Sequence, residues 1–137
     1  MGDQSVVVKR ACPDCGASAR VTIGAQSAKG ELRYFESLRC PGCGCQQEAD
    51  GRELDDDIRN ALCAVHGRWS ARVRDLGPDH PGALLALRRH LGLTPAEALH
   101  VVREARPIVH GALVEVERVQ AQLEPAGIQL AIDRLPD

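Results

Sequence analysis

The segments Cys12-Pro13-Asp14-Cys15-Gly16 and Cys40-Pro41-Gly42-Cys43-Gly44 decide how the first part of this chain is expected to fold. Both follow the pattern Cys-Pro-x-Cys-Gly, in which proline fixes one backbone dihedral angle and glycine permits the left-handed conformation of a tight turn. Each turn presents two thiolates on one side, and two turns supply the four soft ligands that zinc binds as a tetrahedron. The sequence therefore predicts one structural zinc ion held by Cys12, Cys15, Cys40 and Cys43.

The spacer between the two motifs has the pattern of a β-hairpin. Ala19–Ile23 alternates as a strand does, residues 32–38 form a second strand candidate, and residues 25–30 provide the turn. The double motif with this hairpin resembles a zinc ribbon, which implies a small β module folded around one ion. A lone Cys-x-x-Cys can instead be a redox pair, but that alternative needs a single pair in a βαβ setting. Four protein ligands leave the ion no open position, so we expect it to stabilise the fold and not to catalyse hydrolysis.

Two cysteines lie outside the double motif. Cys45 is close enough to be a substitute ligand or a redox-sensitive thiol, although the simpler interpretation is a small side chain beside the site. Cys63 and His66 stand three residues apart on an expected helix, a spacing that suits half of a metal site. Since no second half is evident, a buried thiol and a helix-end histidine are expected there.

The composition limits the classes of function. The chain has 137 residues, so it holds one domain or two small ones, and its net charge of −2 creates no general attraction to nucleic acid or anionic membranes. Aromatic residues make up only 2% of the chain, which provides few rings for stacking on single-stranded nucleic acid. No apolar stretch is long enough for a signal peptide or a membrane span, so a cytoplasmic protein without a membrane partner is expected.

Basic residues of the first segment could form a surface that contacts phosphate. Glu31 and Glu36 interleave with them, and a zinc ion with four thiolates adds negative charge, so a solvated mixed surface is expected. Nucleic-acid binding through the ribbon is the alternative. The basic residues in question are Arg10, Arg20, Lys29, Arg33 and Arg39.

The sequence divides into three segments: a zinc ribbon at 1–47, an acidic linker helix at 48–67, and an α+β domain at 68–137. In the linker, Leu54, Ile58 and Leu62 recur at helical spacing. Asp residues in the first turn complement the helix dipole, and Gly67 provides the stop. This helix is expected to pack the ribbon against the last domain or to cover a sheet.

The third segment predicts the element order β-α-α-(β)-α-β, with helices packed on one face of a small antiparallel sheet. Trp69–Val73 alternates as a half-buried strand, and a helix follows that closes at Gly92. Thr94-Pro95-Ala96-Glu97 has the pattern of a capping box at a second helix. A short strand at Ile108–Val109, a third helix and a strand through Ile128–Ile132 complete the order. The whole chain is thus expected to be an α+β protein.

From Trp69 to Asp133 the sequence resembles the C-terminal domain of the bacterial ribosomal stalk protein, which recruits translation factors to the large subunit. That family places lysines around its second helix, where this chain has Thr94 and Glu97, and a zinc ribbon stands where the stalk protein has its dimerising region and hinge. The Clp protease adaptor is similar in fold, so the resemblance implies recruitment of a protein partner. The segments that carry it are Trp69–Val73, Leu91-Gly92-Leu93, Ala96–Val102, Ala105-Arg106-Pro107 and Leu123–Gly127.

We therefore expect a non-catalytic zinc-binding adaptor that docks a protein or ribonucleoprotein partner, in a ribosome-associated, proteolytic-adaptor or toxin-neutralising context. The sequence shows no nucleophile–base pair and no glycine-rich phosphate loop, so neither enzymatic activity nor a small-molecule substrate is expected. The alternative is a nucleic-acid-binding zinc-ribbon protein with an accessory α+β domain. The expected partner-binding residues, which an ordinary solvated helix surface would also explain, are Arg88, Arg89, Glu97, His100 and Arg103.

Overall fold

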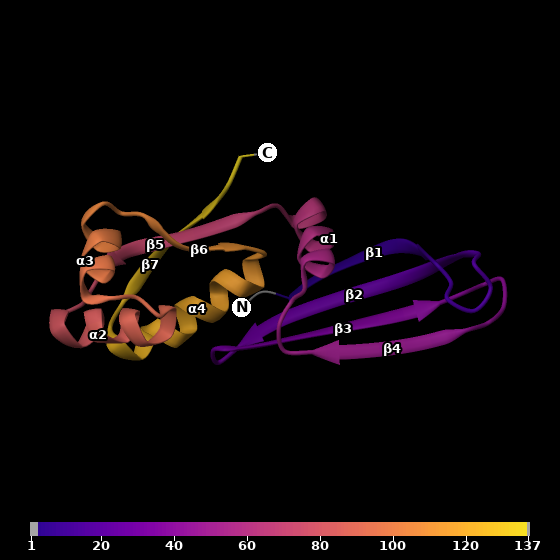
Figure 1. Cartoon of the computed structure of the whole chain (residues 1–137), viewed down its shortest axis with the longest axis horizontal. Coiled ribbons are helices and arrows are strands. Elements are labelled where there is room, and N and C mark those ends of the chain that lie inside the picture. The colour runs from indigo at the N-terminus through magenta and orange to yellow at the C-terminus, as the bar shows by residue number, and fades with distance from the viewer. Residues whose placement is uncertain (1–2, 137) are drawn as a thin grey trace.

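The first part of the chain forms a long four-stranded antiparallel sheet in which each strand pairs with the next (Figure 1). The computed structural model describes residues 3–136. One face of the sheet is buried, and its own apolar side chains, among them Val21, Ile23 and Leu32, form a hydrophobic core there. The strands are β1 (Asp3–Ala11), β2 (Ser18–Ala28), β3 (Glu31–Arg39) and β4 (Gln46–Gly51).

The expected hairpin is confirmed, but its strands are longer than the sequence indicated. β2 and β3 stay paired as far as Ala28 and Glu31. The turn therefore consists of Lys29 and Gly30, which both have positive φ, and not of residues 25–30. The longer strands place both cysteine motifs at the far end of the sheet from this turn.

The structure differs from the expected linker helix in where the helix begins. Residues 46–51 form β4, and helix α1 (Asp56–His66) follows it. β4 shows no hydrophobic alternation because five of its six residues are exposed, so only its pairing with β3 defines it as a strand. β1 was not expected either, although buried Gln4 and Val6 alternate with exposed neighbours.

Helix α1 has the termini that the sequence indicated. The side chain of Asp55 accepts a hydrogen bond from the backbone N–H of Ile58 at 2.8 Å, and Gly67 ends the helix with a φ of 86°. Ile58 and Leu62 are fully buried against the first sheet. The amphipathic pattern of α1 thus covers the ribbon sheet near β1.

The last part of the chain forms a three-stranded antiparallel sheet with β5 at its centre, in the order β6-β5-β7. Its core contains side chains from the sheet, α2 and α4, including Val73, Leu87 and Leu123. The capping box of Thr94 and Glu97 is present as expected. The elements are β5 (Trp69–Asp75), α2 (His80–Leu91), α3 (Pro95–Arg103), β6 (Pro107–Gly111), α4 (Leu113–Leu123), a short 3-10 turn (Glu124–Ala126) and β7 (Gln129–Arg134).

Within residues 3–136 the chain is thus a mixed α+β protein with two antiparallel sheets and four α-helices, which confirms the expected class. The expected α+β segment at 68–137 is tied to the ribbon through α4. Val114 at the start of α4 belongs to the core of the first sheet, whereas Val116 and Val119 belong to the second core. The two halves therefore share one helix.

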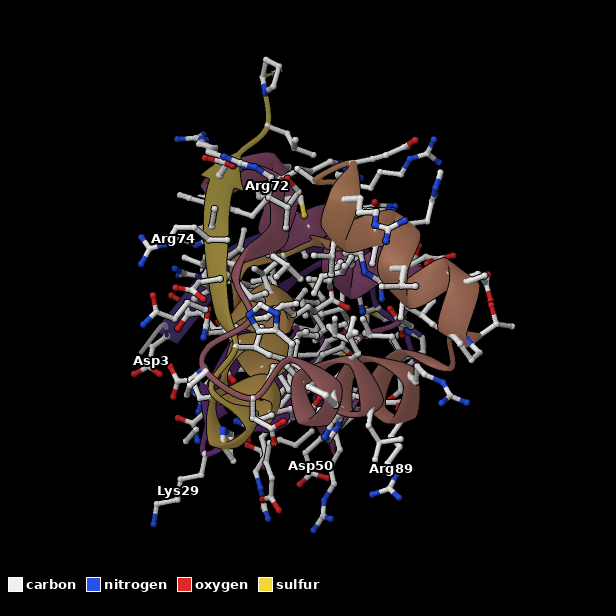
Figure 2. The ribbon with its side chains drawn as sticks, turned by 90° about the vertical axis from the view of Figure 1, so that its left-hand side faces the viewer. Asp3, Lys29, Asp50, Arg72, Arg74 and Arg89 are labelled. Atoms are coloured by element: carbon white, nitrogen blue, oxygen red, sulfur yellow. The ribbon has the colours of Figure 1, made fainter. Side chains whose placement is uncertain are left out.

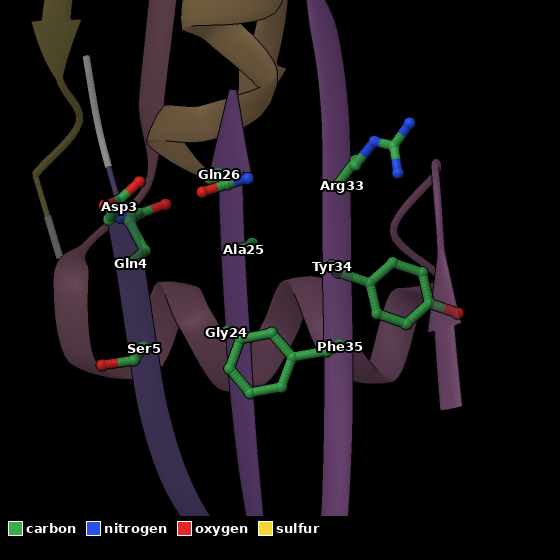
Figure 3. Close-up of a pocket in the computed structure, with 9 residues that line it drawn as sticks. All are labelled: Asp3, Gln4, Ser5, Gly24, Ala25, Gln26, Arg33, Tyr34 and Phe35. Atoms are coloured by element: carbon green, nitrogen blue, oxygen red, sulfur yellow. The ribbon is translucent and has the colours of Figure 1, made fainter. Parts of the chain in front are cut away.

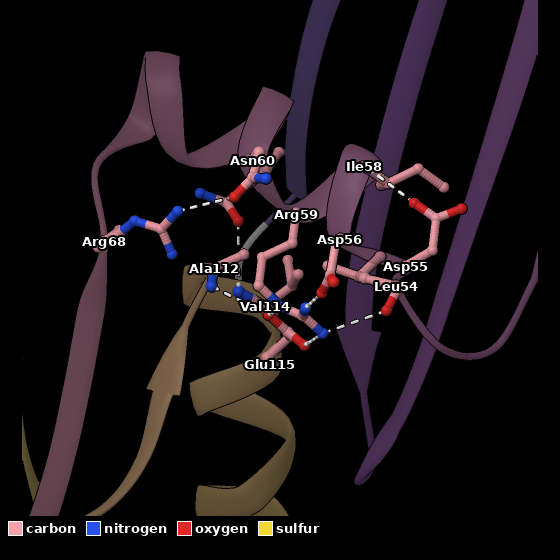
Figure 4. Close-up of polar contacts among 11 residues, drawn as sticks. Leu54, Asp55, Asp56, Ile58, Arg59, Asn60, Arg68, Ala112, Val114 and Glu115 are labelled. Atoms are coloured by element: carbon pink, nitrogen blue, oxygen red, sulfur yellow. Dashed lines mark hydrogen bonds and ion pairs between the residues drawn. The ribbon is translucent and has the colours of Figure 1, made fainter.

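Polar contacts strengthen this junction (Figure 4). Arg59 of α1 reaches Glu115 of α4 through two hydrogen bonds, Nε to Oε1 at 2.8 Å and a terminal nitrogen to Oε2 at 2.9 Å. Glu115 also accepts the backbone N–H of Ala112, and Gln4 of β1 accepts the N–H of Val114. These bonds satisfy N–H groups at the start of α4, which have no partner within the helix.

Gly77 lies at a close approach of two backbone segments, and we expect Gly77→Ala to lower the free energy of unfolding by about 2–3 kcal/mol. Its φ is +76°, and an added Cβ would lie 2.7 Å from the carbonyl oxygen of Gly127. Gly92→Ala is the matched control, because Gly92 has a φ of +67° but open space around it, so a loss of only about 1 kcal/mol is expected. Urea unfolding of both variants measures the difference, and equal losses would contradict the backbone clash.

Candidate metal centre

The two cysteine motifs form turns of the same geometry at one end of the first sheet. In the first turn, the N–H of Cys12 donates to the carbonyl of Ala17 at 2.7 Å, and the N–H of Gly16 donates back to Cys12 at 2.8 Å. Cys40 and Gly44 repeat these bonds in the second turn. Both glycines have a φ near +75°, at +75° and +76°, which explains the glycine in each motif.

The four predicted ligands come together as the sequence indicated. Their sulfur atoms all lie within 4.8 Å of one another. The Sγ atoms of Cys12 and Cys43 are 3.7 Å apart, and those of Cys15 and Cys40 are 3.5 Å apart. A tetrahedral ion with metal–sulfur bonds of about 2.3 Å requires sulfur–sulfur distances of about 3.8 Å. The donor set and its spacing therefore fit one metal ion.

The thiols of this cluster differ in acidity. A hydrogen bond from the backbone of Cys15 is the main cause that lowers the pKa of Cys12 to about 7. At Cys43 the backbone hydrogen bond of Cys45 lowers the pKa, but hydrogen bonding with Cys15, burial and the other thiols outweigh it and raise the pKa to about 12. Four thiolates thus repel one another strongly, and a bound cation is what would hold all four in the charged form.

The two remaining cysteines lie outside the four-sulfur cluster. Cys45 packs beside Cys12 and Cys40, and hydrogen bonding with Asp14 is the main cause that raises its pKa to about 11. Cys63 is buried in the core of the first sheet, where burial raises its pKa. The Nε2 atom of His66 lies 2.7 Å from the carbonyl oxygen of Ser5. His66 is thus held by backbone, and it does not join Cys63 in a cluster of metal ligands among the described residues.

The five expected partner-binding residues are all exposed, but they are not equivalent. Glu97 accepts the backbone N–H of Thr94, which lowers the pKa of Glu97, so its carboxylate is used in helix capping. His100 lies 3.1 Å from Glu104. Within the described part of the chain, Arg88, Arg89 and Arg103 form no ion pair, and Arg89 projects outward from α2 (Figure 2).

Sequence reasoning missed an apolar groove between α2 and α3, which has a volume of about 360 Å³. Leu85 is 39% exposed and Leu99 is 38% exposed, and Pro81, Leu84 and Pro95 complete the apolar lining. Arg88 is the charged residue of the lining. The signal in the sequence was that Leu85 and Leu99 fall beside the buried stripe of each helix, where a polar residue is usual.

The four-sulfur cluster and the α2–α3 groove lie in different parts of the fold, one on each side of α4. Among the described residues, no helix has the length and apolar character needed to cross a membrane. The chain matches no protein-family model, no curated protein and no solved structure at a significant level.

Proposed function

We propose that this protein is a non-catalytic zinc-binding adaptor that docks a protein partner through the α2–α3 groove. Four thiolates are soft ligands that favour zinc, and they fill a tetrahedral shell, so the ion would stabilise the ribbon without an open position for a substrate. Cys12 and Cys40 are 3% exposed and would fix the ion from inside, while Cys15 and Cys43 close it from the solvent side.

The exposed leucine pair of the groove is the observation that supports docking. Leu85 and Leu99 are both exposed in one groove, and Arg88, which also lines it, forms no ion pair within residues 3–136. Apolar anchors beside an unpaired arginine are the composition of energetically important residues at protein interfaces. Arg89 and Arg103 add positive charge on the same two helices, so an amphipathic partner segment with acidic residues fits best.

The resemblance of residues 69–133 to the ribosomal stalk domain supports the same kind of partner. It implies a protein or ribonucleoprotein partner in a ribosome-associated, proteolytic-adaptor or toxin-neutralising context, and it is an analogy of fold. The groove favours a protein partner over a nucleic acid, because its apolar lining suits an apolar helix or turn and not a nucleic-acid backbone.

The test is crosslinking in cells followed by binding measurements with the purified partner. The double variant Leu85→Asp, Leu99→Asp and the single variant Arg88→Glu are compared with Val65→Asp, since Val65 on α1 is 57% exposed and lies outside the groove. We expect the groove variants to weaken the purified complex at least about tenfold, and the Val65 variant to leave it unchanged. The α2–α3 groove is rejected as the docking site if the partner binds the unchanged protein and all three variants equally, or if only the Val65 variant loses affinity.

A further inference from the structure

The outer face of the first sheet carries a row of unpaired cations. The strand register places Lys9 opposite Arg20, and Arg20 opposite Arg39, so the three lie side by side across β1, β2 and β3. Like charges directly opposite each other destabilise a sheet. Nevertheless, none of the three forms an ion pair within residues 3–136. In contrast, Arg10 points to the other face, where it contacts Glu36 at 3.1 Å. An unpaired row of this kind is available to an anionic ligand.

The same face carries an exposed aromatic ring. Phe35 is 51% exposed, and its ring lies across Gly24 of the neighbouring strand (Figure 3). A Cβ at residue 24 would collide with this ring, so glycine is what lets the ring lie flat on the sheet. The ring borders a hollow of about 410 Å³, which Asp3, Gln26 and Arg33 also line. One side of the ring is therefore supported, while the hollow offers polar groups beside it.

Two hydroxyl side chains lie on the outer face between the ring of Phe35 and the row of cations. Thr22 and Ser37 are directly opposite each other and occupy the row between Phe35 and Arg39. Phe35 and Arg39 are four residues apart on one strand, which is about 13 Å. Acidic Glu48 and Asp50 of β4 lie directly opposite Ser37 and Phe35 on this face. An anionic ligand would therefore run over β1, β2 and β3 and keep away from β4.

We propose that this outer face binds single-stranded RNA, with one base stacked on Phe35 and phosphates further along the same RNA strand on Lys9, Arg20 and Arg39. Every base can stack on an aromatic ring, whereas the Asp and Glu side chains of an acidic peptide have no ring to stack, which is why Phe35 beside a row of cations favours nucleic acid. Thr22 and Ser37 lie where the ribose would pass and can bond the 2′-hydroxyl that distinguishes RNA from DNA. This binding is separate from the α2–α3 groove and does not depend on it.

Fluorescence anisotropy of the full-length metal-loaded protein with a labelled single-stranded RNA of about ten nucleotides tests the proposal. Three phosphate contacts predict a slope of about −2 for the logarithm of the binding constant against that of the salt concentration. The double variant Arg20→Glu, Arg39→Glu should abolish binding, and Phe35→Leu should weaken it roughly five- to one-hundred-fold. Leucine is chosen because it keeps an apolar side chain over Gly24, so the fold is retained. Circular dichroism and metal content verify that each variant is folded.

Arg10→Gln is the matched control, because Arg10 belongs to the same sheet but to its other face. It should bind RNA as the unchanged protein does, and so should the double variant Leu85→Asp, Leu99→Asp. The proposal is overturned if no binding occurs at low salt, if Arg10→Gln weakens binding as much as the paired Arg20 and Arg39 changes, or if polyglutamate competes as well as RNA. Single-stranded DNA that binds as tightly as RNA would overturn the role of the ribose.

Discussion

Cys40→Ser is expected to produce a protein that retains no stoichiometric metal and unfolds at a much lower temperature. Cys40 is 3% exposed and supplies one of four sulfurs, so the remaining three cannot close a tetrahedral shell. Metal binding contributes directly to folding free energy in sites of this type. We expect a loss of at least about 4 kcal/mol, or a melting temperature lowered by roughly 15 °C, measured by calorimetry with metal analysis of the same sample.

Cys45→Ser is the matched control for that experiment. Cys45 lies two residues beyond the last ligand and packs against the same turns, but it is outside the cluster of four. This variant should keep one metal ion per chain and nearly the same melting temperature. Full metal content in Cys40→Ser, or a metal chelator that leaves the melting of the unchanged protein unaffected, would contradict a structural metal centre.

Glu115→Ala is expected to destabilise the junction between the two halves by about 2–3 kcal/mol. Its side chain is 12% exposed and accepts two bonds from Arg59 as well as the N–H of Ala112. Removing it would leave Nε of Arg59 without an acceptor and the guanidinium with only Asp56 and the carbonyl of Leu54. Loss of one partner of a partly buried pair costs more than the net value of the pair. The expected loss is smaller than for a fully buried pair, because Arg59 is 26% exposed and water replaces part of the lost interaction. Urea unfolding at neutral pH provides the measurement.

Asp56→Ala tests whether burial or short distance makes the ion pairs of Arg59 stabilising. Asp56 contacts the same Arg59 at 2.7 Å, but its side chain is 93% exposed. Exposed ion pairs contribute little because water competes for both charges, so a loss of about 0.5 kcal/mol or less is expected. If Asp56→Ala and Glu115→Ala lower the free energy of unfolding equally, burial is not the source of the effect at Glu115.

The features that the sequence predicted well are those set by residues close together in the chain. The Cys-Pro-x-Cys-Gly turns and the capping box at Thr94 each depend on a few adjacent residues, and the structure contains both. The strand predicted at Trp69–Val73 was also recognisable from its alternation, although Ser70, which the alternation places on the exposed side, is buried.

The features that the sequence did not predict depend on pairing between distant segments. β4 is defined by hydrogen bonds to β3 and not by any apolar pattern of its own. The sequence alone groups the basic residues of the ribbon into one surface, but strand register places Arg10 on the buried side and adds Lys9 to the row of Arg20 and Arg39. A shift of one residue in register would reverse these assignments, and composition carries no information about it.

The sharing of α4 by both cores has a consequence for any attempt to isolate either half. A fragment that ends before residue 68 would expose the apolar surface that Val114 now covers, and it would also leave Arg59 without Glu115. A fragment that begins there would carry Val114 and Glu115 uncovered at the start of the helix. Proteolysis or domain exchange at residue 67 therefore yields two fragments with exposed apolar surface that are prone to aggregate, and both halves have to be exchanged together.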